Sequence, residues 1–526
     1  MFKKAKVSLA STVLELSDLP RVPGSEVVKS ATVTEWDVMP DIYVNTIDPE
    51  TGEHILAPIT KVSRHTGLTM YDVTTGVSKA YRNMITASDD HSLITYNPIT
   101  LKLEKTTPVD SLGRCVPVMR YNKGNDTDNC IRNVAMPSGV QPLNYDMGML
   151  LGILIGDGWI SETSTNCFST FIACDEPSLQ QFIIDLSVKP NLPFTKQAAL
   201  YAYKPSEGRF SSRDMQRITL YIDSSDAKEL QDMIGHGAGN KRIPPACLAA
   251  PRKHLLGILM GLLATDGSVS HNPPTGRKKS ADKHIAYHTT SVILRDGVQQ
   301  LGRRLGVRTS VTTYTGTTSG NTAYMINFSL EDMVNLYQHN PEHAIIPVDY
   351  KQDAYMRIVN DILDNAKASS KNKSNSYTIV PFPRGLFCEF SWAGIVDLAK
   401  DQVISARAKG FIKRSTALRI AAAMERRDWS IYKDPSYLKK ADQTGRTPEQ
   451  AKAAVDAWIA LVRDENTDWA VVEDVTPSTC TEGWDCTVPG PYTFALSDGT
   501  VVQDTVNIHA PVSRGAVRDI KDKMMP

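Results

Sequence analysis

Two Asp-Gly pairs end the two most apolar stretches of this 526-residue chain. The first stretch reads GMLLGILIGDG over residues 148–158, and the second reads GILMGLLATDG over residues 257–267. The two align without a gap, which indicates an internal duplication with a carboxylate at the end of each copy. The matched pairs are Gly148 and Gly257, Gly152 and Gly261, Asp157 and Asp266, and Gly158 and Gly267.

The spacing of these residues predicts where the carboxylates lie. Each stretch is apolar all round, which favours a helix buried on every side. Glycines four residues apart share one face of a helix and let another backbone approach closely. We therefore expect the helices to pack glycine face to glycine face, with Asp157 and Asp266 at one edge. For a single copy, a turn that merely ends a core helix would be the better interpretation.

Paired carboxylates favour hard divalent cations, Mg²⁺ above all, and such metal sites hydrolyse phosphodiesters. The two motifs resemble the paired signature of LAGLIDADG homing endonucleases, which implies cleavage of double-stranded DNA at a long specific site. The resemblance makes Asp157 and Asp266 the metal-binding carboxylates. NKRIPPACL, residues 240–248, resembles the Lys-x-Ile-Pro block of intein-borne members and implies that Lys241 lies near the attacking water. An ordinary surface lysine is the alternative.

The segments around this duplication have different patterns. Residues 8–125 and 466–504 carry short β-branched runs broken by turn residues. Residues 140–345 alternate helix and strand signals, and residues 346–465 are largely helical. A β module is thus expected to be cut in two by an insertion.

The first β segment resembles the N-terminal blocks of intein splicing domains. TASDDHSLIT, residues 86–95, resembles the Thr-x-x-His block, with Ser88 in place of the threonine and His91 as the histidine. SLASTVLEL, residues 8–16, resembles the block that begins an intein and makes Ser8 the first nucleophile.

The second β segment resembles the C-terminal blocks of inteins. WDCTVPGPYTFALSDGTVVQDT, residues 484–505, ends the implied intein at Asp504, before Thr505. Asp485 is then a candidate for orienting or deprotonating Thr505. Gln503 stands at the position next to last.

The implied splicing chemistry needs no metal or cofactor. The Ser8 hydroxyl attacks the carbonyl carbon of Val7 and converts the amide into an ester. His91 can protonate the leaving nitrogen, and Ser88 can bond the oxyanion. Thr505 then attacks the ester, and the bond after residue 504 breaks.

The C-terminal ending departs from the usual His-Asn. Asp504 has no side-chain amide nitrogen with which to cyclise onto its own carbonyl, and Gln503 cannot transfer a proton as histidine can. The last cleavage is therefore slow, uses another route or is lost. Cys486 is an alternative internal nucleophile, although the presence of Ser8 makes this the minor interpretation.

The expected fold class is α+β, with a split all-β Hint-type splicing domain interrupted by a pseudo-symmetric αβ LAGLIDADG endonuclease domain and a helical insert. Residues 505–526 resemble a segment of the RNA polymerase β′ subunit, which suggests the host protein (the extein). The expected parts are an N-extein remnant at 1–7, the two splicing halves at 8–125 and 466–504, the endonuclease at 140–345, a helical insert that could bind DNA at 346–465, and a C-extein remnant at 505–526.

Bulk properties limit the partners. Lys and Arg number 58 and Asp and Glu also number 58, so a DNA-binding surface must be local. Eight cysteines without a CxxC pair indicate neither a zinc knuckle nor a disulfide scaffold. The N-terminus is a poor match to a signal peptide, and no apolar run is long enough to span a membrane. We expect a cytoplasmic monomer whose partners are double-stranded DNA and the flanking extein segments.

Three functions remain open from the sequence. The first is an intein that both splices and cuts DNA. The second is a homing endonuclease whose β module no longer splices, and the third is a fragment of an RNA polymerase β′-like subunit with an inactive insertion.

Overall fold

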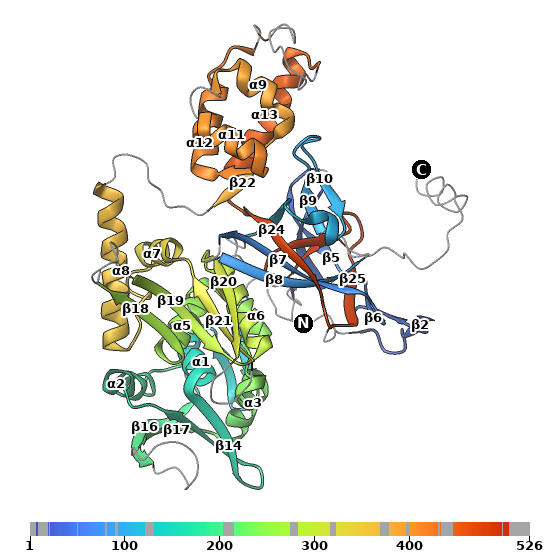
Figure 1. The fold of residues 1–526 in the computed structure, drawn as a ribbon. Helices are drawn as coiled ribbons and strands as arrows, with labels where there is room; N and C mark the ends of the chain where they lie inside the picture. The colour runs from blue at the N-terminus through green and yellow to red at the C-terminus, as the bar shows by residue number, and fades with distance from the viewer. Residues whose placement is uncertain are drawn as a thin grey trace.

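The computed structural model places three groups of elements in separate lobes (Figure 1). We call them the duplicated unit (133–368), the split β unit (7–119 with 467–503) and the helical unit (379–463). The residues that the structure describes are 7–8, 19, 21–40, 42–49, 51–78, 81–89, 93–120, 131–203, 215–273, 282–315, 322–368, 378–395, 400–429, 432, 445–496 and 498–503.

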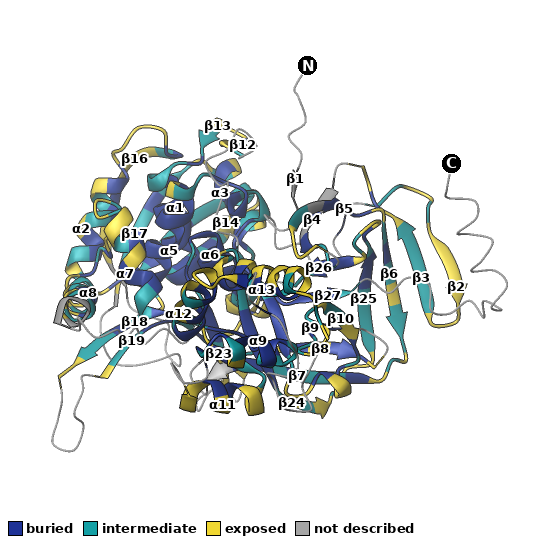
Figure 2. Cartoon of the chain, turned by 90° about the horizontal axis from the view of Figure 1, so that it is seen from above, coloured by how far each residue is buried: buried dark blue, intermediate teal, exposed yellow. Residues whose placement is uncertain are grey.

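Two apolar helices form the centre of the duplicated unit. Helix α1 (Tyr145–Asp157) starts at Asn144, whose side chain accepts a hydrogen bond from Met147 N. Helix α5 (Arg252–Ala264) packs directly against it, and both are buried along nearly their whole length (Figure 2). A helix that is apolar on every side has no stable position on a surface, so each buries the other.

Glycines set the distance between these helices. A Cβ atom at Gly152 would lie 2.4 Å from the backbone oxygen of Ile258, and one at Gly261 would lie 2.6 Å from that of Met149. No side chain fits in that space, so the backbones themselves are in contact. The expected glycine-to-glycine packing is present.

The same succession of elements follows each central helix. After α1 the sheet order is β14-β15-β17-β16, and after α5 it is β18-β19-β21-β20, so the two halves have the same topology. The first half contains β14 (Gly158–Ser164), β15 (Cys167–Ala173), α2 (Pro177–Leu186), β16 (Phe194–Tyr203), β17 (Met215–Ile222) and α3 (Ser224–Ile234). The second contains β18 (Gly267–Asn272), β19 (Asp282–Thr289), α6 (Val292–Arg304), β20 (Thr309–Thr315), β21 (Thr322–Phe328) and α7 (Leu330–His339).

Shorter elements and one long helix complete this unit. Helix α8 (Asp349–Ala368) packs on β18, and its Tyr355 and Ile358 belong to the same hydrophobic core as α1 and α5. The boundary expected at residue 346 therefore differs from the structure, because the following helix covers the duplicated unit. The remaining elements are β12 (Asn133–Met136), β13 (Gly139–Pro142), a 3-10 turn at Ala238–Asn240 and α4 (Pro245–Leu248).

The split β unit takes strands from both ends of the chain into one sheet. Its order is β26-β27-β9-β11-β24-β7-β8, so β24 from the C-terminal part lies between two strands of the N-terminal part. The strands are β1 (Val7–Ser8), β2 (Val27–Ser30), β3 (Val33–Asp37), β4 (Ile42–Ile47), β5 (His54–Pro58), β6 (Lys61–Thr66), β7 (Met70–Ser78), β8 (Tyr81–Ser88), β9 (Leu93–Tyr96), β10 (Leu103–Thr106), β11 (Cys115–Met119), β24 (Thr467–Pro477), β25 (Glu482–Thr487), β26 (Thr493–Ala495) and β27 (Val501–Gln503).

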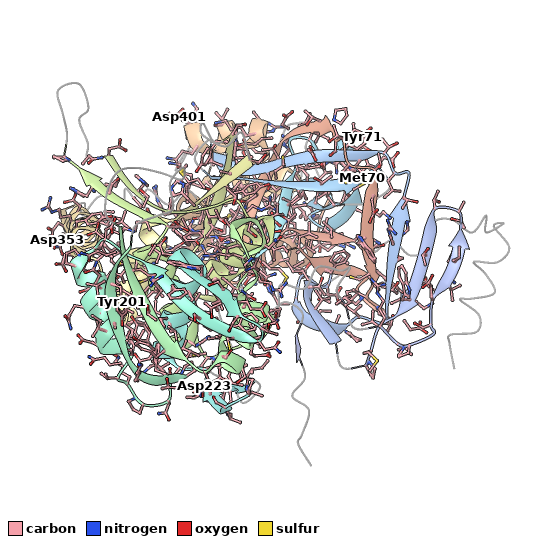
Figure 3. All side chains as sticks on the ribbon, turned by 90° about the horizontal axis from the view of Figure 1, so that it is seen from below. Met70, Tyr71, Tyr201, Asp223, Asp353 and Asp401 are labelled. Carbon is pink, nitrogen blue, oxygen red and sulfur yellow. The ribbon has the colours of Figure 1, made fainter. Side chains whose placement is uncertain are left out.

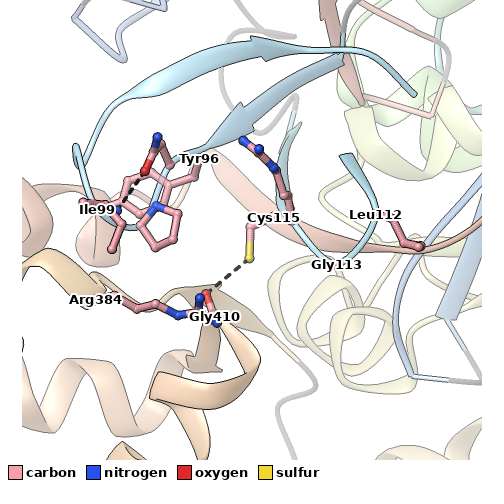
Figure 4. A pocket seen from close by; sticks show the side chains of 10 residues that line it. Tyr96, Ile99, Leu112, Gly113, Cys115, Arg384 and Gly410 are labelled. Atoms are coloured by element: carbon pink, nitrogen blue, oxygen red, sulfur yellow. Dashed lines mark hydrogen bonds between the residues drawn. The ribbon is translucent and has the colours of Figure 1, made fainter. Parts of the chain in front are cut away.

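The helical unit packs on this sheet through a shared hydrophobic core that includes Tyr96 and Trp469 of the sheet. Aromatic side chains also pack against each other inside the helical unit. Phe390 contacts both Phe382 and Trp458, and the Trp458 indole donates to the backbone oxygen of Pro381. A pocket of about 400 Å³ lies at the junction, between Tyr96 and Arg384 (Figure 4). The elements are β22 (Ile379–Pro381), α9 (Phe387–Trp392), α11 (Lys400–Lys409), β23 (Phe411–Lys413), α12 (Arg414–Glu425) and α13 (Pro448–Arg463).

The duplicated unit also contacts the split β unit. Strand β20 lies beside β8, and Gln299 donates through Nε2 to Asn83 Oδ1 at 3.1 Å (Figure 1). Within the described part of the chain, no helix is both long enough and apolar enough to cross a membrane.

The glycine contact can be tested by adding one methyl group. We expect Gly152→Ala to destabilise the duplicated unit by about 3 kcal/mol, because the new Cβ would overlap the backbone oxygen of Ile258. Scanning calorimetry would measure the loss. Gly239→Ala is the matched control, since a Cβ there meets nothing within 4 Å. Equal melting profiles for the two variants would contradict the packing.

Candidate active site at the ends of two packed helices

The two repeated carboxylates are close enough for the charge of one to shift the pKa of the other. Asp157 is the last residue of α1, and Asp266 lies in the turn between α5 and β18. Burial, followed by the charge of Asp266, raises the pKa of Asp157 to about 6. Asp266 is the more exposed of the two, yet loss of hydration at the site raises its pKa as well. The structure thus brings this predicted pair together.

Lys241 lies at the same edge and holds the end of α1. Its Nζ donates to the backbone oxygens of Gly156 at 2.5 Å and Gly158 at 3.0 Å. Burial lowers its pKa, while the charges of Asp266 and Asp157 oppose that shift. The ammonium therefore satisfies carbonyl groups that a helix C-terminus leaves unpaired.

A second lysine that the sequence analysis missed does the same for α5. Lys351 of α8 donates through Nζ to the backbone oxygens of Leu263, Ala264 and Thr265, at 3.1, 2.9 and 2.7 Å. Burial lowers its pKa too, against the charges of Asp157 and Asp266.

A weak sequence signal for Lys351 exists. Ile346-Pro347 repeats the Ile-Pro of the 240–248 block, but here the lysine follows the proline instead of preceding the isoleucine. A search for the Lys-x-Ile-Pro order therefore fails, although the packing brings both ammonium groups to equivalent places.

The oxygen ligands of Asp157 and Asp266 suit a divalent cation whose remaining ligands do not come from the protein. Burial raises the pKa of both carboxyl groups, and the charge of Asp266 raises that of Asp157 further, so a cation bound here would offset negative charge. Among the described residues, no group of three or more His, Cys, Asp and Glu side chains could enclose a metal ion. Asp157 and Asp266 would thus hold an ion whose other ligands are water and phosphate oxygens, as Mg²⁺ prefers.

The first half of the duplicated unit presents cations and aromatic rings on its open sheet face. In β17, buried residues alternate with Arg217 and Tyr221, which lie on the other face. The Arg217 guanidinium lies 4.6 Å from the Phe171 ring centre, and Lys196 Nζ lies 3.8 Å from that of Tyr221. Tyr201, labelled in Figure 3, shares a 2.9 Å hydrogen bond with the Tyr221 hydroxyl. Such a face can contact both phosphates and bases.

Two of the candidate splicing residues lie on strands of different sheets whose partner strands are in contact. Ser8 in β1 pairs with Tyr43 in β4, and Gln503 in β27 pairs with Thr493 in β26. The strands β4 and β26 touch, because Thr46 Oγ1 lies 2.6 Å from Thr493 Oγ1. The backbone thereby brings the two ends of the implied intein to neighbouring elements.

Ser88 lies on β8, at the opposite edge of the eight-stranded sheet from β26 and β27. It is the last residue of β8 and is buried. Leu93, five residues later, begins β9 and pairs with Val502 of β27. His91 lies outside the described residues.

Asp485 occupies a different sheet. It is buried in β25, opposite Ser63 of β6, and its Oδ1 accepts a hydrogen bond from Cys486 N at 2.8 Å. The sheet β2-β3-β6-β25 does not include the strands of Ser8 or Gln503. Asp504 and Thr505 lie outside the described residues.

Comparisons with known proteins identify part of the duplicated unit. A family model described as a LAGLIDADG-like domain matches residues 253–340. The prediction of such a domain is therefore confirmed for that stretch, and the mixed α and β fold agrees with it. The intein, Hint and RNA polymerase β′ resemblances stay predictions.

Two curated relatives share short stretches with the chain. An ATP-dependent DNA helicase of Thermococcus kodakarensis is 28% identical over 211 residues, 40% of this chain. A DNA polymerase of Thermococcus sp. (strain GE8) is 25% identical over 257 residues, 46% of this chain. The chain spans only 17% of that helicase and 14% of that polymerase.

Solved structures also resemble the chain at low scores. The homing endonuclease I-DmoI in complex with DNA and Ca is 16% identical, with a TM-score of 0.24, covering 38% of this chain and 89% of that one. The homing endonuclease I-WcaI bound to its DNA recognition sequence is 15% identical, with a TM-score of 0.28, covering 40% and 85%.

The raised pKa of Asp157 predicts how pH affects metal binding. Protons compete with a cation for a carboxyl of pKa about 6, so we expect Mn²⁺ affinity to be about tenfold weaker at pH 5 than at pH 7.5. Paramagnetic resonance of Mn²⁺ would measure it without DNA. Asp157→Asn should bind little at either pH, whereas Asp232→Asn, on the exposed face of α3, should match the parent. A pH-independent affinity in the parent would contradict this assignment.

Proposed function

We propose that the chain is an intein that splices itself from a host protein and carries a LAGLIDADG homing endonuclease. The endonuclease part cuts double-stranded DNA at a specific site. The observation that carries this proposal is the edge where two glycine-packed helices end, with two carboxylates of raised pKa and a lysine at each helix end. The match of residues 253–340 to a LAGLIDADG-like domain supports it.

The chain's own residues account for most of the chemistry at this edge. Hydrolysis requires that water lose a proton and attack phosphorus while one bridging P–O bond breaks. Asp157 and Asp266 would hold a divalent ion, which when bound supplies charge stabilisation and lowers the pKa of water. Lys241 and Lys351 fix the helix ends and offset the negative charge of the carboxylates.

The sheet faces would bind the DNA. Lys196 and Arg217 supply local positive charge to a chain whose total formal charge is zero. The helical unit could add a second contact, because Arg419, Arg426 and Arg427 are exposed on or just after α12. A packing helix with a solvated charged face is the alternative for α12.

Two observations support the splicing part. The split β unit completes one sheet with strands from both ends of the chain, and the strands that pair with those of Ser8 and Gln503, β4 and β26, are in contact. In addition, the chain matches small fractions of a helicase and of a polymerase, enzymes of different kinds. A segment shared by unlike proteins is what an inserted element would produce.

The sequence at the C-terminal junction favours a second candidate, an endonuclease whose β unit has lost splicing. Asp504 lacks the amide nitrogen that cyclises in the usual last step. For the host protein, we infer an RNA polymerase β′-like subunit from residues 505–526. These residues alone could not polymerise RNA.

DNA cutting can be tested on the site that the insertion would have interrupted. The substrate is a plasmid in which codons 1–7 of the native gene are joined to codons 505–526. We expect the parent to cut it with Mg²⁺, and Asp157→Asn to be slower by about a thousandfold, because loss of a metal ligand removes several kcal/mol of stabilisation. Lys351→Met should be slower by about 10–100-fold.

The control is Lys228→Met, which changes an exposed lysine paired with Asp232 on α3. It should cut at the parental rate. Undiminished cutting by Asp157→Asn would sink the site assignment.

Splicing can be followed by intact mass after expression between two foreign domains. We expect joined domains and a released species spanning 8–504, formed slowly by the parent and faster by Asp504→Asn, whose amide can cyclise. Ser8→Ala should give neither product, because no ester can form. If only precursor is found in both the parent and Asp504→Asn, the chain does not splice, and the endonuclease alone remains.

A further inference from the structure

The two halves of the duplicated unit differ at one position beside the carboxylates. Gly158 of β14 pairs with Ile172 of β15, and the equivalent Gly267 of β18 pairs with Tyr287 of β19. The residue after each partner is therefore equivalent as well. It is an alanine, Ala173, in the first half and a histidine, His288, in the second half.

Neighbouring strands reinforce this difference. Ala173 pairs with Arg217 of β17, whereas His288 pairs with Met325 of β21. The first half thus has a permanent cation near this position. The second half has an imidazole there, with a thioether as its cross-strand neighbour.

Tyr314 of β20 holds the His288 ring. The tyrosine hydroxyl lies 3.1 Å from His288 Nδ1, and the rings meet edge-to-face with centres 6.3 Å apart. With Nδ1 occupied, the described residues offer Nε2 no hydrogen-bond partner. Nε2 is therefore the ring's remaining polar atom for a ligand.

Asp266 lies within electrostatic range of His288. Partial burial lowers the pKa of His288, while the carboxylate of Asp266 opposes that shift. The imidazole is thus mainly neutral at pH 7. When the Tyr314 hydroxyl donates to Nδ1, the ring proton resides on Nε2, which becomes a donor.

The other cationic groups of the site do not create this asymmetry. Lys241 and Lys351 occupy equivalent places, and each donates to backbone oxygens at a helix end. The nearest histidine along β19, His284, is held between the hydroxyls of Ser268 and Ser270 at 2.8 and 2.7 Å. Among the histidines in the described part of the chain, His288 is the one that combines a ring held by a hydrogen bond with an unoccupied nitrogen within electrostatic range of Asp266.

We propose that His288, oriented by Tyr314, donates to a backbone phosphate of the DNA strand that is cut beside Asp266, and that Ala173, at the equivalent position beside Asp157, gives the other strand no such imidazole contact. The two strands are consequently cut at unequal rates. This inference rests on the proposed endonuclease function and adds a residue that serves one strand only.

Strand-resolved cutting tests the proposal. The probe is the joined-flank plasmid described above, linearised and labelled at one end of each strand in turn. We expect His288→Ala to slow one strand about tenfold and the other less than twofold, since a lost hydrogen bond to a charged group costs about 1.5 kcal/mol. Nicked DNA should then accumulate.

Three further variants separate positioning from folding. Tyr314→Phe removes one oxygen and should slow the same strand. His288→Gln keeps an N–H donor at similar reach and should restore part of the rate. Thr313→Ala changes the preceding residue of β20, which faces the other side of the sheet, and should leave both rates unchanged.

Slowing of both strands alike by His288→Ala and by Tyr314→Phe would overturn the one-strand role and leave the endonuclease intact. Failure of the parent to cut the joined-flank plasmid would overturn the proposed function together with this inference.

Discussion

Direct contact between the backbones of α1 and α5 is the constraint on which the rest of the duplicated unit depends. An added Cβ atom at Gly152 or Gly261 would lie 2.4 or 2.6 Å from a backbone oxygen of the other helix. The glycines therefore leave no room for a side chain at the crossing. Such contact fixes the rotation and the depth of both helices at once. This contact alone therefore brings together the carboxylates at the helix ends. The strands that come after each helix have the same topology.

This contact also concentrates negative charge. Both helices point their C-terminal ends, with their unpaired carbonyl groups, toward the edge that already carries Asp157 and Asp266. Lys241 and Lys351 relieve part of this charge by donating to those carbonyls. Burial raises the pKa of both carboxyl groups, and the charge of Asp266 adds to the shift of Asp157, which is the electrostatic condition under which a cation binds.

The sequence predicts the features that a repeat makes visible. The matched glycines predicted the packing of the two helices, and the matched carboxylates predicted that Asp157 and Asp266 lie together. Lys351 was missed because its position relative to the proline differs from that of Lys241, so only the folded backbone reveals their equivalence. The role we propose for His288 needs strand register, because sequence alone does not align it with Ala173.

Other limits arise from long-range contacts. The boundary at residue 346 was expected from helical periodicity, which does not indicate which hydrophobic core a helix joins. In the structure, Tyr355 belongs to the hydrophobic core of the duplicated unit. The link between the strands of Ser8 and Gln503 runs through β4 and β26, whose contact no local pattern encodes. Ser8, Gln503 and Asp485, which the motifs group as candidate splicing residues, lie in three different sheets.

The interleaving of β24 between β7 and β11 has a consequence for biosynthesis. Cys115 pairs with Val471, and the residues between them include the whole duplicated unit and helical unit. On the ribosome, β11 therefore waits without its neighbour until the C-terminal strands emerge, long after α1 and α5 can pack. The intervening folded units then shorten the distance that this late pairing must close. Translation order alone thus delays closure of the sheet until the duplicated unit and the helical unit have been made.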